Sequence, residues 1–310
     1  MSKNVEIGKT GLFVNPLGLG TNAVGGHNLF PSLNDETGKE IVRTAINNGI
    51  DFLDTAFIYG PGRSEELIGE VLKETGKRQE IVVATKGAHK FLDGKVIVDN
   101  NPSFLKETVE NSLRRLQTDY IDLFYIHFPD ENTPKEEAIG SLSRLKEEGK
   151  IRAIGVSNFT LDQLKEGNQD GHIDVLQSGY NLIKREAEND LIPYANEHNI
   201  SFIPYFPLAS GLLTGKFDKN STFEDGRSKN PLFQGEAFDR NLEKVEQLRV
   251  IANVKNVAVS NLVLAWYLAQ DTIDVIIPGA KKSEQVLDNI KTLEVQLSLQ
   301  EIKEIDQIFQ

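Results

Sequence analysis

Polar and ionisable residues stand at the ends of several short apolar, β-branched runs of this chain. Asp54 closes one run, Lys86 directly follows a second and His127 follows a third. Later runs end in amide, hydroxyl and phenol side chains: Ser157, Asn158, Gln177 and Tyr205. Each residue taken singly has an ordinary structural role as a turn cap, a solvated charge or a core polar group. If the runs are neighbouring parallel strands, however, their carboxyl ends meet at one rim and these side chains converge there.

Tyr59 lies shortly after Asp54, in a loop that can fold back over the same rim. A phenol has an ordinary pKa of about 10, and a nearby ammonium such as Lys86 makes it a better proton donor by favouring the phenolate. A buried lysine keeps its charge only when it is paired, and Asp54 is the expected partner. His127 can hydrogen-bond a carbonyl oxygen. The set predicts a site that delivers a proton to oxygen and needs a cofactor for any redox step.

The composition limits the classes of function. The 310 residues carry 34 Lys and Arg against 46 Asp and Glu, a net charge of −12, which disfavours broad contact with nucleic acid or anionic lipid. The chain has no cysteine, which excludes disulfides, thiolate nucleophiles and cysteine metal sites. The longest apolar run, Leu262–Ala269, is far shorter than the roughly 20 residues of a membrane helix, and the N-terminus lacks a signal-peptide core. We therefore expect a cytoplasmic protein that binds a small molecule, without a metal, nucleic acid or membrane.

The order of apolar runs and helical stretches predicts the fold class. Eight runs alternate with segments of helical period: Pro16–Gly20, Asp51–Asp54, Ile81–Thr85, Ile121–Ile126, Arg152–Val156, Asp174–Gln177, Ser201–Tyr205 and Asp274–Ile277. This alternation is typical of βαβ units, and eight of them predict an α/β protein with a closed (β/α)8 TIM barrel. No linker divides the chain, so residues 1–310 are expected to form one domain. An open doubly wound sheet is the alternative, disfavoured because no strand precedes G-x-G-x-x-G.

Capping signals predict where several helices begin. Thr133-Pro134-Lys135-Glu136 resembles a capping box and predicts a helix over 134–148, and Asn101 before Pro102 starts another. Three further starts are Thr160 with Gln163, Ser283, and Ser298 with Glu301. The elements expected beyond the barrel are a bottom-capping N-terminal hairpin of Val5–Ile7 and Leu12–Val14, a long segment Phe206–Phe238, a helix near Asn241–Ala252 and a C-terminal helix ending at Phe309.

Ordered motifs along the chain resemble the aldo-keto reductases. The strings are Gly49-Ile50-Asp51-Phe52-Leu53-Asp54-Thr55-Ala56, Tyr59-Gly60, Ser64-Glu65, Thr85-Lys86, Tyr125-Ile126-His127, Ile154-Gly155-Val156-Ser157-Asn158, Tyr205 to Gly211, and Ile277-Pro278-Gly279-Ala280. The match runs from about residue 5 to residue 305. The resemblance implies a (β/α)8 barrel that binds NADPH without a Rossmann fold and reduces aldehydes and ketones by hydride transfer. Within the family, the chain is most similar to a bacterial group associated with inositol catabolism.

The resemblance also implies roles for individual residues. Tyr59 becomes the general acid, Lys86 and Asp54 its tuning pair, and His127 the group that positions the carbonyl. The residues implied around the nicotinamide are Gly20, Thr21, Asn22, Asp54, Ser157, Asn158 and Gln177, with Tyr205 stacked on the ring. Amide side chains suit a carboxamide because it offers both donors and acceptors. One covered face would direct hydride from the other.

Two stretches are implied to hold the cofactor's phosphates and adenine. The stretch after the seventh strand contributes Phe206, Pro207, Leu208, Ala209, Ser210, Gly211, Leu213 and Lys216, whose small residues let backbone N–H groups approach a pyrophosphate. The stretch after the eighth contributes Gly279, Ala280, Lys281, Gln285 and Asn289. A helix start with lysines suits a 2′-phosphate and favours NADPH over NADH. Gln285 departs from many relatives, which have arginine there, and carries no charge.

Other functions and finer questions stay open from the sequence. A cofactor-binding, redox-sensing module with little turnover is the main alternative, and a metal-dependent barrel enzyme would need more His and carboxylates at strand ends. His27, Phe57, Phe91 and Phe128 either shape a substrate pocket or pack as ordinary loop residues. The resemblance implies a monomer. The physiological substrate is not encoded in the barrel pattern, because specificity resides in loops.

Overall fold

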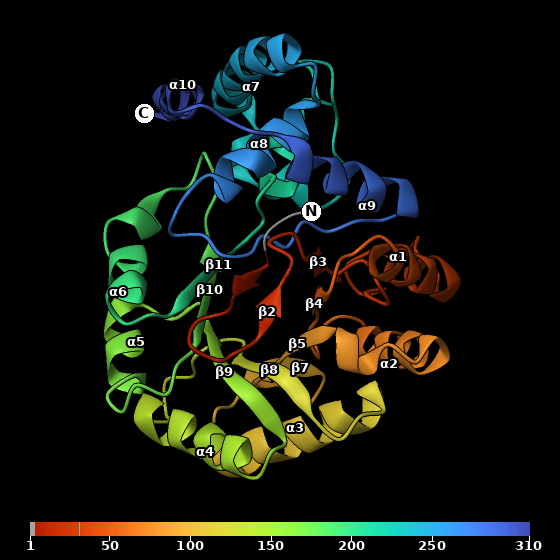
Figure 1. The fold of residues 1–310 in the computed structure, drawn as a ribbon, viewed down its shortest axis with the longest axis vertical. Helices are drawn as coiled ribbons and strands as arrows, with labels where there is room; N and C mark the ends of the chain where they lie inside the picture. The colour runs from red at the N-terminus through yellow and green to blue at the C-terminus, as the bar shows by residue number, and fades with distance from the viewer. Residues whose placement is uncertain (1–3, 31) are drawn as a thin grey trace.

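The computed structural model describes residues 4–30 and 32–310, which build a parallel sheet curled into a barrel and surrounded by helices (Figure 1). The sheet has the strand order β11-β10-β9-β8-β5-β4-β3. Its strands are β3 (Leu19–Gly20), β4 (Phe52–Asp54), β5 (Val82–Gly87), β8 (Ile121–Ile126), β9 (Ile151–Ser157), β10 (Val175–Gly179) and β11 (Ser201–Tyr205). All six pairings are parallel, as the predicted βαβ repeats require.

The barrel closes through the segment after α8 rather than through a regular eighth strand. The predicted strand Asp274–Ile277 forms isolated parallel bridges, Leu17 with Ile276 and Gly20 with Gly279, so the prediction of a continuous strand there is wrong. Pro16 and Pro278 flank these pairings and cannot donate a backbone hydrogen bond, which shortens the ladder. On the other side, the Ser201 hydroxyl of β11 donates to the Asp274 carboxylate. The architecture is a (β/α)8 barrel, as the sequence predicted.

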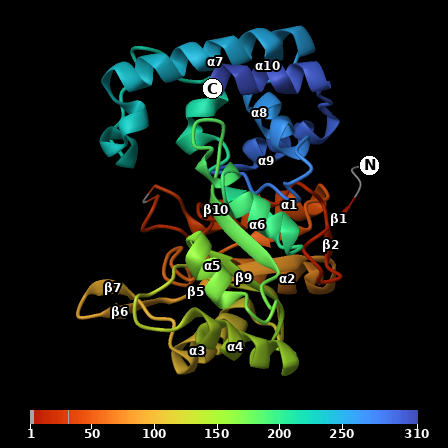
Figure 2. The same cartoon turned by 90° about the vertical axis from the view of Figure 1, so that its left-hand side faces the viewer.

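Helices cover the outside of the sheet because each carries one apolar face. The ring contains α1 (Asp35–Asn47), α2 (Arg63–Thr75), α3 (Pro102–Leu116), α4 (Lys135–Glu147), α5 (Leu161–Gly167), α6 (Leu191–Glu197), α8 (Val259–Leu268) and α9 (Ser283–Ile290). In α3, for example, Leu105 and Val109 are fully buried on one face. The long α7 (Gly235–Lys255) and α10 (Leu299–Phe309) pack together beyond α8, at one end of the molecule (Figures 1 and 2).

Short 3-10 helices occupy several connections of the barrel: η1 (Arg78–Glu80), η2 (Glu186–Glu188), η3 (Ala209–Thr214), η4 (Gly226–Lys229), η5 (Pro231–Phe233) and η6 (Lys291–Glu294).

The inside of the barrel is a packed core closed at its bottom by the N-terminal hairpin. Strands β1 (Val5–Glu6) and β2 (Phe13–Val14) pair antiparallel. Ile7 and Val14 are fully buried and join the cluster that Phe52, Leu123 and Ile203 form inside the barrel. The predicted bottom-capping hairpin is therefore confirmed, and the opposite end of the strands is left as the mouth.

The capping predictions mostly hold. Thr160 with Gln163 and Ser298 with Glu301 form reciprocal capping boxes, and Asn101 caps α3. The predicted box at Thr133 is wrong, because its hydroxyl donates to Asp130 Oδ2 at 2.9 Å and α4 begins only at Lys135. The Asp130 carboxylate competes successfully, since it also accepts from the Thr133 backbone.

A second hairpin, β6 (His89–Leu92) with β7 (Lys95–Val98), lies between β5 and α3 and was not predicted. Asp93 and Gly94 form its turn with φ of 50° and 74°, the left-handed pair that an Asp-Gly hairpin favours. That dipeptide was the available sequence signal. Figure 2 shows the hairpin projecting from the side of the molecule opposite β1 and β2.

Within residues 4–30 and 32–310, no single helix is long and apolar enough to span a membrane. Only α7 and α8 taken together meet that criterion, and they are bent by 88° at their junction.

Candidate active site

A buried ion pair forms the floor of the barrel mouth. Asp54 ends β4, Lys86 lies in the adjacent β5, and the two residues are 2% and 0% exposed. The Lys86 ammonium donates to the Asp54 carboxylate and, at 2.9 Å, to the Thr55 carbonyl. Gln177 Nε2 donates to the other Asp54 oxygen at 2.9 Å. Burial lowers the pKa of Lys86 and the Asp54 carboxylate opposes that shift, as expected for a desolvated lysine held by its partner.

The phenol of Tyr59 lies over this pair. Lys86 Nζ is 5.7 Å from the centre of the Tyr59 ring, and the His127 ring centre is 6.4 Å away, edge-on. Burial, and then the charge of Asp54, raise the pKa of Tyr59 above its usual range. Lys86 was expected to make this phenol more acidic, but the net shift of the Tyr59 pKa is upward, because burial disfavours the phenolate and the Asp54 carboxylate repels it. Tyr59 is a protonated hydrogen-bond donor at neutral pH.

A neutral imidazole stands at the same mouth. Burial, and then the charges of Lys86 and His89, lower the pKa of His127 well below its usual range. The His89 ring lies edge-on to it with ring centres 4.9 Å apart, and Nδ1 of each ring is buried without a protein partner in the described part of the chain. His89 was not among the predicted site residues, although its position just after β5 was a usable signal. A neutral imidazole here can hydrogen-bond a carbonyl oxygen without adding charge.

The amide residues predicted around the nicotinamide come together beside this pair. Tyr205 donates through its hydroxyl to Asn158 Oδ1 at 2.8 Å, and Asn158 Nδ2 donates to the His127 carbonyl at 3.0 Å. Ser157 and Gln177 are 1% and 3% exposed in the same rim. Hydroxyl, amide and phenol groups therefore border the ion pair on the β9–β11 side.

The ends of β3 and of the closing segment form the other side of the rim. Thr21 Oγ1 donates to the Asp54 carbonyl at 2.9 Å, and Gly20 pairs with Asp54 in the sheet. Asn22 lies against Gly279, where an added Cβ would sit 3.1 Å from Asn22 Oδ1. The predicted residues Gly20, Thr21, Asn22 and Gly279 are thus neighbours.

The loop after β11, which was predicted to hold the cofactor's pyrophosphate, contains a run of left-handed residues. Ala209, Ser210 and Gly211 in η3 follow one another with φ of 46°, 56° and 92°. Phe206 is also left-handed, with φ of 54°, and is 57% exposed. The Lys216 ammonium packs on Gly211, where an added Cβ would be 3.2 Å from Nζ. Within this loop the N–H groups of Ala209 and Gly211 donate to the carbonyls of Phe206 and Leu208, at 2.9 Å and 2.8 Å, so these two groups are not free to bind an anion.

Three cations gather near this loop. Lys216 Nζ and Arg227 Cζ lie 4.9 Å and 5.4 Å from the centre of the Phe217 ring. Burial, and then the charges of Arg227 and Lys281, lower the pKa of Lys216. Arg227 was not predicted, because only the tertiary structure brings η4 beside Lys216 and Lys281. These three positive charges, of which Arg227 also pairs with Asp225, make this loop a candidate anion site in an otherwise acidic protein.

The start of α9 is organised by Gln285. Its Oε1 accepts from the Lys281 backbone N–H at 2.7 Å, which fixes the turn that follows the closing segment. Ala280 is buried there and Asn289 lies half-buried one turn further along the helix. The side chain predicted to contact phosphate therefore also has a structural partner.

The loop residues expected near the substrate divide into two groups. Phe57 and Phe91 contact each other with ring centres 6.2 Å apart, and Phe91 and Phe128 are 50% and 39% exposed. His27 instead contacts Asp35 through Nε2 at 2.8 Å. The aromatic rings form a rim, whereas His27 holds its own loop to the start of α1.

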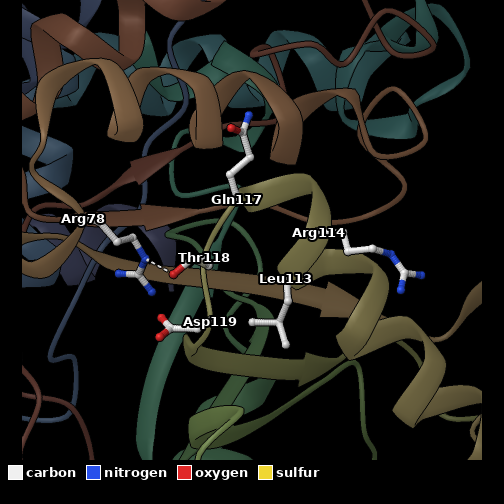
Figure 3. A pocket seen from close by; sticks show the side chains of 6 residues that line it. All are labelled: Arg78, Leu113, Arg114, Gln117, Thr118 and Asp119. Carbon is white, nitrogen blue, oxygen red and sulfur yellow. Dashed lines mark hydrogen bonds between the residues drawn. The ribbon is translucent and has the colours of Figure 1, made fainter.

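A separate hollow lies at the opposite end of the barrel (Figure 3). It is lined by Arg78, Leu113, Arg114, Gln117, Thr118 and Asp119, near the starts of β5 and β8. Arg78 donates to Thr118 there at 3.1 Å. None of the predicted site residues borders it. Among residues 4–30 and 32–310, no three His, Asp or Glu side chains are grouped as metal ligands would be.

Known proteins resemble this chain over nearly its whole length. The model of the Aldo/keto reductase family matches residues 16–310. Aldo-keto reductase YhdN of Bacillus subtilis is 40% identical over 284 residues, covering 91% of this chain and 86% of that protein. The Schizosaccharomyces pombe aldo-keto reductase yakc, whose name specifies NADP(+), is 34% identical over 93% of this chain and 86% of that protein.

Two further similarities bear on cofactor and fold. The NADH-specific methylglyoxal reductase of Escherichia coli is 33% identical over 96% of this chain and 95% of that protein. The solved structure of the glycerol dehydrogenase AKR11B4 from Gluconobacter oxydans superposes with a TM-score of 0.92 at 34% identity, covering 98% of this chain and 94% of that one.

Proposed function

The chain belongs to the aldo/keto reductase family, and we propose that it is an NADPH-dependent carbonyl reductase with Tyr59 as the general acid. One observation carries the proposal. The protonated Tyr59 phenol lies over the buried Asp54–Lys86 pair, beside the neutral imidazole of His127. The arrangement supplies a proton donor at a carbonyl oxygen and nothing that could act as a nucleophile.

The residues present suit a nicotinamide dinucleotide. Asn158 and Gln177 place amide groups at the mouth, and Tyr205 offers an aromatic face beside them. A dinucleotide bound there supplies the hydride that the side chains cannot. The positive charges of Lys216 and Lys281 favour binding of an adenosine that carries a 2′-phosphate, and therefore NADPH over NADH. The names of two relatives of similar identity specify different cofactors, NADP(+) in one and NADH in the other.

The side chains of this chain have separate tasks in the proposed reaction. Tyr59 donates its proton to the carbonyl oxygen, and His127 holds that oxygen through a neutral hydrogen bond. The Lys86 ammonium stabilises the negative charge that develops on the phenol as the proton leaves, and Asp54 keeps the ammonium in place. Losing one donor to such a developing oxyanion costs about 3 to 4 kcal/mol, or roughly 100- to 1,000-fold in rate.

The test compares NADPH consumption by the wild type with that of Tyr59→Phe. The variant is expected to lose at least 100-fold in kcat and to bind NADPH within twofold of the wild type, because the phenyl ring stays. Tyr120→Phe is the matched control, since Tyr120 lies at the bottom of the barrel between the guanidinium groups of Arg78 and Arg152. Equal activity of the wild type and Tyr59→Phe would reject the proposed acid.

The assay also separates the reductase from a redox-sensing module. A sensor would oxidise one equivalent of bound NADPH and then stop, whereas a reductase turns over many times. The panel of substrates contains aldehydes, ketones and inositol-derived ketoses, and activity confined to the last would support a link to inositol catabolism. We further propose a monomer, to be checked by sedimentation.

A further inference from the structure

The loop that carries Tyr59 leaves two of its backbone groups without partners inside the loop. Tyr59 N–H donates to the Ala56 carbonyl and the Tyr59 carbonyl accepts from Ser64 N–H, both at 3.1 Å. The groups on either side, the Ile58 carbonyl and the Gly60 N–H, are instead held by one side chain from another loop. That side chain is Asn28.

We propose that Asn28 is a positioning residue for Tyr59, an inference that rests on the proposed function. Asn28 Nδ2 donates to the Ile58 carbonyl at 3.1 Å, and its Oδ1 accepts from the Gly60 N–H at 2.7 Å. These two groups belong to the peptide planes immediately before and after the Tyr59 Cα. Holding both planes fixes the two soft backbone dihedrals of Tyr59 and hence the direction of its side chain.

The loop that carries Asn28 is itself firmly held against the Tyr59 loop. Gly60 has φ of 65°, and an added Cβ there would lie only 1.9 Å from the Gly25 carbonyl oxygen, so the two backbones touch. The His27 ring contacts Asp35, and Asp35 accepts from Arg63 at 2.7 Å. These contacts tie the segment before Asn28 to the beginnings of α1 and α2.

The position of Asn28 separates an effect on catalysis from an effect on folding. Its side chain is exposed, whereas Tyr59 is half-buried at the mouth of the barrel. An exposed polar side chain contributes little to the core, but a displacement of a reacting group by about 1 Å can cost 100-fold in rate. Loss of the Asn28 amide should therefore reduce turnover far more than it reduces stability.

The experiment uses Asn28→Ala in the full chain, with Asn48→Ala as control. Asn48 is also exposed and also donates to a backbone carbonyl, that of Thr44 at 2.7 Å, but at the far end of α1. We expect Asn28→Ala to lower kcat roughly 10- to 100-fold, with the Kd for NADPH and the melting temperature close to wild type. The control should match the wild type in all three measurements.

A double-mutant cycle shows whether Asn28 acts through the phenol. In the Tyr59→Phe background, where no proton donor remains to be oriented, Asn28→Ala should change the residual kcat by less than twofold. An equal loss in both backgrounds, or a loss of NADPH affinity instead of kcat, would overturn the proposal.

Hydrogen exchange tests the positioning without reference to activity. Asn28→Ala should speed exchange in the peptide covering residues 56–64, and Asn48→Ala should not. If the wild type does not reduce carbonyls but Asn28→Ala still speeds exchange over residues 56–64, the proposed function fails while the positioning of the Tyr59 loop by Asn28 stands. Unchanged exchange over residues 56–64 in Asn28→Ala would refute the positioning role of Asn28.

Discussion

Lys86→Met removes the positive half of the buried pair and leaves Asp54 facing a methionine of similar length. Lys86 is fully buried and Asp54 is 2% exposed, so water cannot replace the lost partner. The ammonium's bonds to Asp54 and to the Thr55 carbonyl disappear together, and only Gln177 continues to donate to Asp54. The variant isolates the free-energy cost of one unpaired buried charge.

The expected loss is about 3 to 5 kcal/mol of unfolding free energy, the usual result of breaking a buried pair from one side. That is a large share of the roughly 5 to 15 kcal/mol that stabilise a typical domain. The double variant Lys86→Met with Asp54→Asn removes the stranded carboxylate, and Gln177 can still hydrogen-bond the asparagine. It should recover most of the loss, which gives a coupling of about 2 kcal/mol or more between the two sites.

Guanidinium denaturation followed by tryptophan fluorescence measures both variants. Trp266 is the only tryptophan and is fully buried in α8, away from the mutated pair, so its signal reports global unfolding. Two results would refute the reasoning. One is a Lys86→Met variant within 1 kcal/mol of the wild type, and the other is a double variant less stable than the single one.

Three further predictions follow from the charges and the rim. Burial lowers the pKa of His89 and His127, so below about pH 6.5 the unfolded chain binds protons at these residues before the folded chain does, and the unfolding free energy should fall as the pH decreases. Denaturation at several pH values measures this dependence, and His127→Gln should make the unfolding free energy change less with pH. Arg227→Ala should weaken the binding of NADPH roughly tenfold and that of NADH less than twofold in fluorescence titrations, because it removes one positive charge beside Lys281. Equal weakening of both affinities would contradict a role of Arg227 at a phosphate. Phe91→Ser should raise KM for aromatic aldehydes about fivefold and leave kcat unchanged, because it removes an exposed aromatic face. An equal rise in KM for acetaldehyde would show that Phe91 does not recognise the aromatic ring of the substrate.

Much of the fold was predictable because its signals are local. The strand ranges Ile121–Ile126 and Ser201–Tyr205 were predicted to the residue, since a short, mostly apolar run between turn signals marks a buried parallel strand. The closing segment was not, because backbone pairing depends on prolines in two distant stretches. At Thr133 the cap lost to the Asp130 carboxylate, a competition that a local motif does not reveal.

The sequence by itself determined which chemical groups reach the barrel mouth. Asp54, Lys86 and His127 lie at or just after the carboxyl ends of strands, and parallel strands deliver such residues to one rim whatever the details of packing. The proton affinities of these groups were decided only by the tertiary structure, because they depend on burial and on charges from several strands at once. The same holds for Arg227 beside Lys216 and for Asn28 over the Tyr59 loop. Such contacts join segments that no sequence period relates, so folding alone brings them together.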